Sequence, residues 1–234
     1  MTRIAKRWLV PTAVVVAAIV VGLGASGASA VTSSNLVFTV TTAQSEINGS
    51  PNQGWWSNQA NDVNSNSNTN YFTGHDVAFN DTLRGYFTFD TSGMRFCSSS
   101  TAYLTVPAAN GGNQAKFGDG PSSLELGVFD VSTDPVTLSH KVNNPNSTIY
   151  NDLGSGTQYG DDILPTTTTN TNFTLDLNQS AIDDMLSAHA AHNQYFSFGL
   201  GLIDPPSGDA FLFADSGGHI ASLTVSTPRI CKVA

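Results

Sequence analysis

The sequence predicts an all-β sandwich or barrel with one short helix, and three observations predict it. Apolar and polar residues alternate over many short runs. Clusters of Gly, Asn, Pro and Ser separate these runs. Only 12% of the residues are charged, so Asn, Thr and Ser must supply most of the polar surface. This composition excludes a coiled coil, a basic nucleic-acid binder and a charge-rich disordered chain.

Residues 1–30 are predicted to be a signal peptide that is removed. Three basic residues come first, an apolar run from Val14 to Leu23 follows, and Ala28-Ser29-Ala30 forms a small-residue cleavage site. A membrane anchor is the alternative, but Pro11 interrupts the apolar segment. We therefore expect a secreted, extracellular protein with no membrane span after cleavage.

Residues 31–234 are expected to form one β-sandwich domain. Cleavage removes three of the nine basic residues and none of the 18 acidic residues, so the formal net charge changes from −9 to −12. A charge this negative disfavours nucleic acid and anionic lipid as partners.

Nine runs have the character of strands. In chain order they are Leu36–Thr42, Leu83–Asp90, Thr101–Val106, Leu124–Val131, Val136–Ser139, Asn172–Leu177, Tyr195–Ile203, Ala210–Ala214 and Ile220–Ser226.

Two of these runs predict which face is buried. In Leu83–Asp90 the inward residues are expected to be Leu83, Gly85, Phe87 and Phe89, with Arg84, Tyr86 and Thr88 outside. In Tyr195–Ile203, Phe196, Phe198, Leu200 and Leu202 share one face. Ser197, Gly199 and Gly201 share the other, and the glycines predict close packing of another segment there.

The single predicted helix covers about 179–191. Ile182, Met185, Leu186 and His189 lie on one stripe, and Asn178 or Ser180 is the expected N-cap.

Two cysteines are present, Cys97 and Cys231. In an oxidising compartment an even pair predicts a disulfide, which would join the C-terminal segment to the region after an early strand. Two free thiols are the alternative.

Trp55 and Trp56 are adjacent in the sequence and are the strongest candidates for a binding site. Neighbouring strand residues point to opposite faces, so one ring could be exposed and stack on a sugar. Tyr71 and His75 lie beyond an Asn-rich stretch and could extend this platform. The alternative is that both tryptophans cover the end of the core, because large aromatic residues are usually buried.

No cofactor is predicted, although a structural Ca²⁺ is possible. Oxygen-bearing residues gather at Asp119, Asp161, Asp162, Asp204 and Asp209, but none of these segments has the sequence of a Ca²⁺-binding loop. Turn formation explains the same residues. His189 and His192 have a spacing that could serve a metal, but no third ligand is indicated.

No motif of nucleophilic, metal-dependent or nucleotide-dependent catalysis is present. Glu46 and Glu125 are the only glutamates, so no carboxylate pair stands out. We expect a protein that is not an enzyme, with a small glycan hydrolase as a minor alternative.

Several segments together resemble a known family. Arg84–Asp90 and Ser98–Val106 are similar to the core of secreted jelly-roll β-sandwich domains, which include the DNRLRE-type domains and related carbohydrate-binding modules. Asn70-Tyr71, Leu126–Ser132 and Leu153–Gly160 resemble segments of a less characterised secreted bacterial family. Members of that family often carry a C-terminal sorting tail.

The resemblance implies a jelly-roll-like antiparallel β-sandwich at the cell surface or outside the cell, with glycan or matrix binding. The segment Thr227–Ala234 has no hydrophobic tail, so attachment through a sorting signal is not expected. Two functions are therefore expected first: a non-catalytic module for neutral polysaccharide or cell-wall glycan, or a purely structural extracellular protein. The oligomeric state is not predicted.

Overall fold

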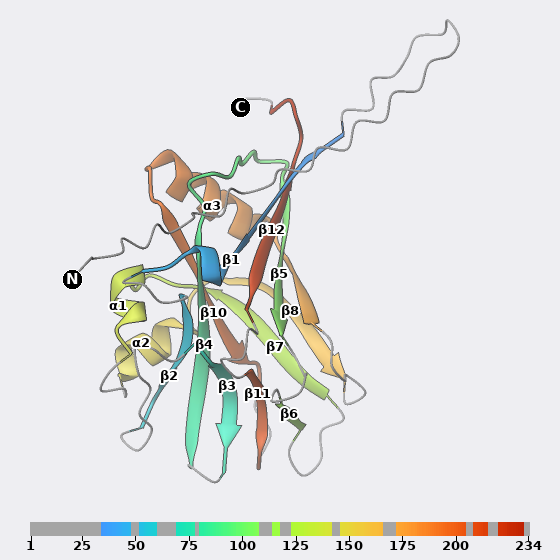
Figure 1. The fold of residues 1–234 in the computed structure, drawn as a ribbon. Helices are drawn as coiled ribbons and strands as arrows, with labels where there is room; N and C mark the ends of the chain where they lie inside the picture. The colour runs from blue at the N-terminus through green and yellow to red at the C-terminus, as the bar shows by residue number, and fades with distance from the viewer. Residues whose placement is uncertain are drawn as a thin grey trace, which may run out of the picture. The chain divides into compact units, whose positions relative to one another are not determined.

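The computed structural model describes residues 34–47, 52–59, 69–77, 80–107, 114–117, 123–141, 146–165, 172–204, 208–214 and 220–231. All of them belong to one compact unit, Ser33–Ala234. The described strands form two antiparallel sheets that pack face to face, which confirms the predicted all-β sandwich (Figure 1). The predicted signal peptide, residues 1–30, lies outside the described residues.

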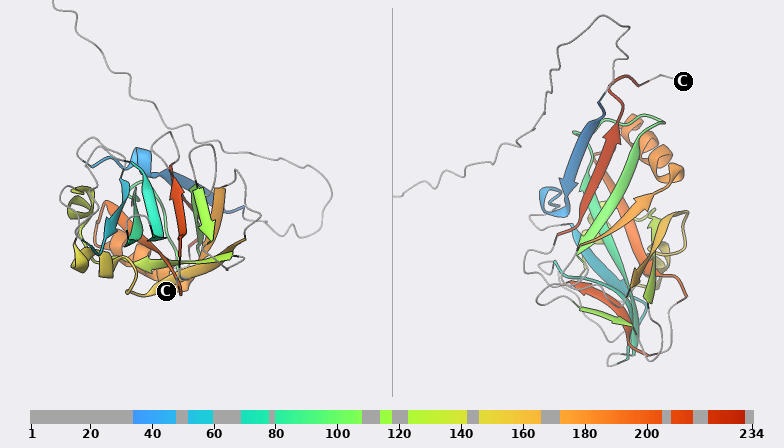
Figure 2. Two further views of the ribbon diagram at one scale, coloured as in Figure 1. Left: turned by 90° about the horizontal axis from the view of Figure 1, so that it is seen from below. Right: turned by 90° about the vertical axis from the view of Figure 1, so that its right-hand side faces the viewer.

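The smaller sheet has four strands within the described residues, and they lie side by side in the right-hand view of Figure 2. In spatial order they are β1 (Leu36–Thr41), β12 (Ser222–Thr227), β5 (Thr101–Pro107) and β9 (Asn172–Leu177). Leu36 lies opposite Thr227, so the first and last described strands pair with each other.

The larger sheet has eight strands in the described part of the chain. Seven follow one path: β6 (Gln114–Phe117), β11 (Ala210–Ala214), β3 (Tyr71–Asp76), β4 (Asp81–Asp90), β10 (Tyr195–Leu202), β7 (Ser123–Asp130) and β8 (Gln158–Pro165). The eighth, β2 (Gln53–Ser57), pairs with β4.

The main core fills the space between the sheets. Phe87 and Phe89 of β4 pack there with Phe198 of β10, and the rings of Phe89 and Phe198 meet edge to face with centroids 6.0 Å apart. The buried faces predicted for these two strands are therefore confirmed.

The other face of β4 was predicted to be outside, and for Tyr86 and Thr88 this is wrong. Both are fully buried, and Tyr86 lies under two short helices. They are α1 (Pro135–Ser139) and α2 (Ser147–Asp152). Leu138 and Ile149 from these helices form a second apolar cluster with Trp56 and Tyr86.

The glycine face of β10 accepts a close neighbour, as predicted. A Cβ atom added to Gly199 would lie 2.7 Å from the carbonyl carbon of Leu153, the residue that follows α2. Only glycine lets the backbone after α2 approach the strand this closely.

Residues Val136–Ser139 were predicted to be a strand but lie in helix α1. The Asp134 side chain accepts hydrogen bonds from the backbone N–H groups of Val136 and Thr137, and Pro135 occupies the first turn. An Asp N-cap followed by Pro is a strong helix start, and it overrides the strand propensity of Val136.

The predicted helix is confirmed as α3 (Gln179–Ala190), with Asn178 as its N-cap. Ile182 and Met185 are buried against the main core. The predicted disulfide between Cys97 and Cys231 is also present, with a Cα–Cα distance of 5.6 Å.

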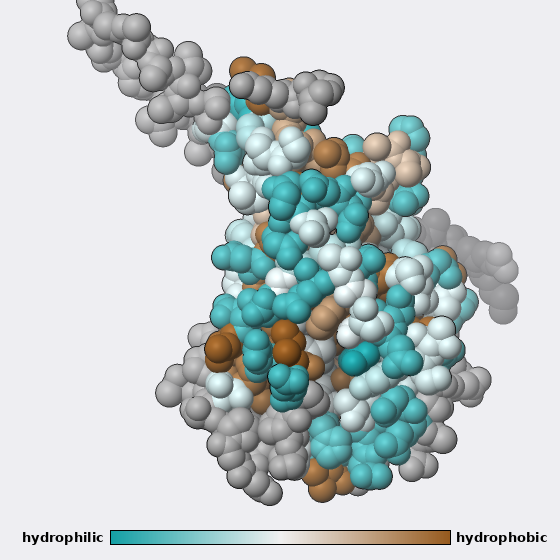
Figure 3. Space-filling model, turned by 180° about the vertical axis from the view of Figure 1, so that it is seen from behind, coloured by the Kyte–Doolittle hydropathy of each residue, from teal (hydrophilic) through white to brown (hydrophobic). Residues whose placement is uncertain are grey.

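No helix in the described ranges is long and apolar enough to cross a membrane. Figure 3 shows that residues of hydrophilic or intermediate hydropathy cover most of one face of the described structure, with hydrophobic residues in smaller groups.

Candidate functional site

The predicted aromatic platform is not exposed. Trp55 and Trp56 have 6% and 4% of their surface accessible, and Tyr71 has none. The two tryptophans do point to opposite faces of β2, as strand geometry requires. The outward ring of Trp56 is nevertheless covered by the helices α1 and α2, so neither ring can stack on a sugar in this structure.

Tyr71 and His75 are both engaged within the fold. The Tyr71 hydroxyl donates to the carbonyl of Pro107, and its ring packs on Phe87 with centroids 5.0 Å apart. Burial raises the pKa of the Tyr71 hydroxyl well above its ordinary value. His75 is half-buried, with Nδ1 3.0 Å from the carbonyl oxygen of Gly208. These four residues therefore form no common exposed surface.

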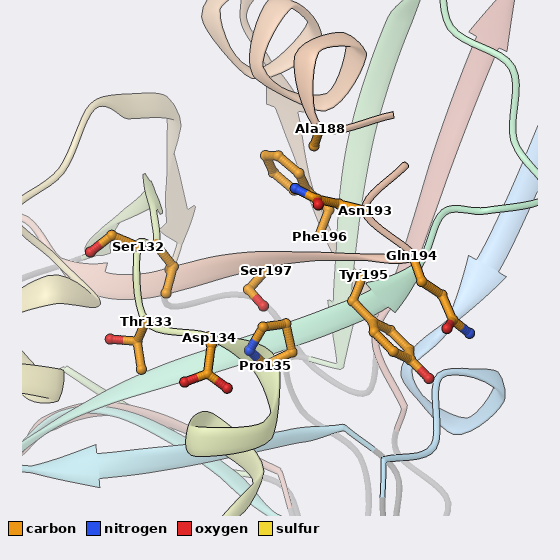
Figure 4. A pocket seen from close by; sticks show the side chains of 11 residues that line it. Ser132, Thr133, Asp134, Pro135, Ala188, Asn193, Gln194, Tyr195, Phe196 and Ser197 are labelled. Atoms are coloured by element: carbon orange, nitrogen blue, oxygen red, sulfur yellow. The ribbon is translucent and has the colours of Figure 1, made fainter. Parts of the chain in front are cut away.

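A different region of the described structure forms a pocket of about 450 Å³ (Figure 4). One wall is the segment Val131–Pro135, which links β7 to α1. The opposite wall comes from the end of α3 and the start of β10. The residues of that wall are Ala188, Asn193, Gln194, Tyr195, Phe196 and Ser197.

The first wall is held by a single carboxylate from α2. Asp152 accepts hydrogen bonds from the hydroxyls of Ser132 and Thr133 at 2.7 and 2.6 Å. It also accepts bonds from their backbone N–H groups at 3.3 and 2.8 Å. Burial alone would raise the pKa of Asp152, but these four bonds outweigh it and the pKa is lowered. The wall is therefore fixed to α2 by an ionised group.

Asp134 presents the carboxylate on the pocket wall. The Thr137 hydroxyl and backbone N–H, together with the N–H of Val136, donate to it as the cap of α1. The Thr137 side chain, more than any other group, lowers the pKa of Asp134. The lining of this pocket thus includes an ionised hydrogen-bond acceptor.

The opposite wall is shaped by the turn after α3. His192 has a φ of 61°, in the left-handed region, and the N–H of Asn193 donates to the carbonyl of Ala188 at 2.9 Å. This is the hydrogen-bond pattern of a Schellman helix end. Gln194 is then held by Asp90, whose carboxylate accepts from its side-chain amide at 2.8 Å.

Three residues of β10, namely Tyr195, Phe196 and Ser197, complete the lining. The Ser197 hydroxyl shares a hydrogen bond of 2.7 Å with the hydroxyl of Thr88, and both side chains are buried. The ring of Phe196 packs beside that of Tyr159, with centroids 6.2 Å apart. Figure 4 shows Ser197 between Asp134 and Pro135 on one side and Phe196 and Asn193 on the other.

Next to the pocket, the carboxylates of Asp130 and Asp184 are both hydrogen-bonded to the hydroxyl of one tyrosine. The Tyr159 hydroxyl lies 3.0 Å from an Asp130 oxygen and 2.8 Å from an Asp184 oxygen. Burial is the largest cause, and the two acidic neighbours a further cause, of a pKa of Tyr159 well above its ordinary value. In a glycoside hydrolase, the substrate's glycosidic bond or a water molecule lies between two catalytic carboxylates. Here the Tyr159 hydroxyl occupies the space between the Asp130 and Asp184 oxygens.

The residues proposed for metals are dispersed. The ring of His189 packs on Phe96 with centroids 5.5 Å apart, and His192 lies in the turn after α3. Asp161 and Asp162 are exposed on β8, and Asp209 accepts from the N–H of Val77 at 2.8 Å. Asp119 lies outside the described residues. Among the residues that are described, no group of three or more His, Cys, Asp or Glu could hold a metal ion.

The pocket combines hydroxyl, amide and carboxylate groups with the rings of Tyr195, Phe196 and Pro135. None of the described lining residues is Lys or Arg, so the lining offers no cation to an anionic ligand. The sequence patterns did not indicate this site, because its polar residues look like ordinary turn residues. The one available signal was Asp134-Pro135, a helix start that brings the first wall into place.

No protein-family model matches the chain, and no curated protein matches it. The resemblance to secreted jelly-roll domains therefore stays a prediction.

Proposed function

We propose that the protein is a secreted, non-catalytic binding protein whose ligand is a neutral saccharide held in the pocket between Val131–Pro135 and Asn193–Ser197. The observation that carries this proposal is the pocket lining, in which hydroxyl groups, amide groups and one carboxylate, that of Asp134, accompany the rings of Tyr195 and Phe196. Sugars present hydroxyls at their edges and apolar C–H groups on their faces, which matches such a lining. The volume of about 450 Å³ lies in the range of small-molecule sites.

The fixed walls support the same proposal. Asp152 holds Ser132 and Thr133, and Asp90 holds Gln194, before any ligand arrives. A site that is ordered in advance loses less entropy when it binds. The disulfide between Cys97 and Cys231 supports residence in an oxidising, extracellular compartment.

The test is retention of the secreted protein on neutral polysaccharides and on an array of neutral oligosaccharides. Tyr195→Ala removes a ring from the pocket, and Tyr103→Ala removes a partly exposed ring from the outer face of the smaller sheet. We expect Tyr195→Ala to weaken binding about tenfold, equivalent to about 1.4 kcal/mol. Tyr103→Ala should bind as the parent protein does. Binding that falls equally in both variants would contradict the location of the site.

The alternative is a structural extracellular protein with no glycan ligand. The burial of Trp55 and Trp56 favours it, because the aromatic residues first expected to bind sugar contribute to packing instead. Failure of the parent protein to bind any neutral saccharide would support this alternative.

A further inference from the structure

Strand β1 forms an open edge of the smaller sheet. It pairs with β12 on one side, and it has no strand partner on the other side in the described part of the chain. Figure 2 shows β1, in blue, at the margin of that sheet. Every second residue of an edge strand directs its N–H and C=O groups away from the sheet. The N–H and C=O of Thr41 are already hydrogen-bonded to the side chains of Gln44 and Ser45, so the preceding residues of β1 are those that can pair with another strand.

The opposite edge of the same sheet is closed. The N–H of Asn178, just after β9, donates to the carbonyl of Tyr159 in β8 at 2.6 Å. A Cβ atom at Gly160 would overlap the carbonyl oxygen of Asp176, so the two backbones touch. The sandwich is therefore joined along β8 and β9 and left open along β1.

The sequence of β1 lacks the features that usually protect an edge. Its six residues are Leu-Val-Phe-Thr-Val-Thr, with high strand propensity and no charge, proline or glycine. Natural edge strands are commonly protected by Lys, Pro or a bulge. Val37 has 65% of its surface exposed on this unprotected strand.

The charges of the protein favour contact at this edge. The chain has a net charge of −9, yet β1, β12 and β5 contain no charged residue. Two copies could approach here without the repulsion that acts over an acidic surface. The outer side chains are mostly hydroxyls, and the Thr39 and Thr224 hydroxyls are already hydrogen-bonded at 3.0 Å. A hydroxyl both donates and accepts, so this surface is complementary to a copy of itself.

We propose that β1 is a dimerisation edge, where two copies of the chain pair their β1 strands in antiparallel orientation about a two-fold axis. The pairing would extend each four-stranded sheet into one continuous sheet. Side chains alternate between the two faces of a strand, so the outer faces of both copies lie on the same side of the joined sheet only in some registers. In these registers a residue on the two-fold axis pairs with itself, for example Thr39 with Thr39 or Phe38 with Phe38 of the second copy. This inference does not depend on the saccharide pocket.

The test is sedimentation of the secreted protein over a range of concentrations, with two matched variants. Val37→Lys places a charge on the edge strand, and Val77→Lys makes the same change at a site of similar exposure, 52%, before β4. We expect the parent protein and Val77→Lys to form a dimer at high concentration and Val37→Lys to remain a monomer. A monomeric parent protein at every concentration, or a dimer that persists in Val37→Lys, would overturn the proposal.

Hydrogen exchange keeps the proposal testable if Val37→Lys does not fold. The amides of Leu36–Thr41 in the parent protein should exchange more slowly at high protein concentration than at low concentration. Exchange at β1 that is independent of concentration would rule out pairing through this strand.

Discussion

Thr133 donates its hydroxyl to the carboxylate of Asp152 at 2.6 Å, which links the pocket wall to helix α2. Ser132 contacts the same carboxylate, so one acidic residue fixes two consecutive residues of the wall. The position of this wall thus depends on a residue that does not itself line the pocket.

The first prediction concerns Asp152→Asn. An amide can accept on one oxygen only, so it cannot replace a carboxylate that accepts four hydrogen bonds. We expect the free energy of unfolding at pH 7 to fall by about 1–3 kcal/mol, as measured by urea denaturation. Asp176→Asn is the control, because Asp176 is exposed on β9, and it should change stability by less than about 0.5 kcal/mol.

The stability that Asp152 contributes should depend on pH in a defined direction. Hydrogen bonds lower the pKa of Asp152 in the folded protein, so its contribution is complete above the ordinary pKa of 3.8. The contribution is lost as the pH falls through the lower, folded value. The difference between the parent protein and Asp152→Asn should therefore shrink below about pH 4. A difference that is the same at pH 3 and pH 7 would show that ionised Asp152 is not what holds the wall.

Arg84→Met tests the attachment of α2 to the larger sheet. The Arg84 guanidinium donates to the carbonyls of Tyr150 and Asn151 at 2.9 and 3.2 Å, and it lies 4.3 Å from the centre of the Tyr150 ring. A cation at the end of a helix is favourable, and these contacts would all be lost. We expect a thermal denaturation experiment to give a loss of about 2 kcal/mol.

Arg95→Met is the matched control for Arg84→Met. Arg95 is exposed, and its backbone carbonyl accepts a hydrogen bond from the Thr227 hydroxyl, which the substitution retains. Its effect should stay below about 0.5 kcal/mol. Equal losses in the two variants would mean that the guanidinium contacts of Arg84 contribute nothing specific.

Gly199→Ala tests the close approach between β10 and the backbone after α2. The added methyl group would overlap Leu153, and neither backbone can move without displacing the sheet or the helix. We expect a loss of about 1–3 kcal/mol in urea denaturation. Gly85→Ala on the neighbouring strand is the comparison, because its nearest contacts would be ordinary ones at 3.5–3.6 Å. If both alanine variants are equally stable, the contact with Leu153 is not restrictive.

Alternation along single strands predicted much of the fold. The bounds Asn172–Leu177 and Ala210–Ala214, and the buried faces of β4 and β10, follow from period-two patterns and match the structure. An alternating pattern along a strand indicates which residues share a face of the sheet, but it does not indicate which other elements cover that face. The burial of Tyr86 under α1 and α2 was therefore missed.

The candidate site was harder to predict than the strands, because the exposure of its residues depends on elements that are distant in sequence. Trp55 and Trp56 were chosen for their side-chain chemistry, but both are buried, and Trp56 is covered by helices that are distant in sequence. The pocket joins residues near position 133 with residues near position 195. Only the pairing of β7 with β10 brings these segments together, and no local pattern encodes that pairing.

The last prediction concerns Lys141, a cation that is almost completely buried. Its ammonium group donates to the carbonyl of Gln53 at 3.0 Å, and burial lowers its pKa from 10.5 to about 8. The unfolded chain therefore binds more protons than the folded protein between pH 8 and about pH 10. Stability should rise with pH across this interval, and the rise should end near pH 10 as tyrosines of the unfolded chain begin to ionise. Burial raises the pKa of Tyr71 and Tyr86, so above about pH 10 these hydroxyls stay protonated in the folded protein but ionise in the unfolded chain. This difference favours the unfolded chain.

Lys141→Met should abolish the rise of stability between pH 8 and about pH 10. It should not change the loss of stability above about pH 10 that comes from tyrosine ionisation in the unfolded chain. Methionine fills a similar volume without a charge, so we expect it to increase the free energy of unfolding at pH 7 by about 1–2 kcal/mol, after the lost hydrogen bond is included. The advantage should disappear by about pH 10, where Lys141 is neutral in the folded parent protein. Urea denaturation at intervals from pH 7 to pH 10 measures both effects. A parent protein whose stability is flat or falling between pH 8 and pH 9.5 would show that Lys141 keeps its ordinary pKa, because no other described group with a shifted pKa raises stability in that interval.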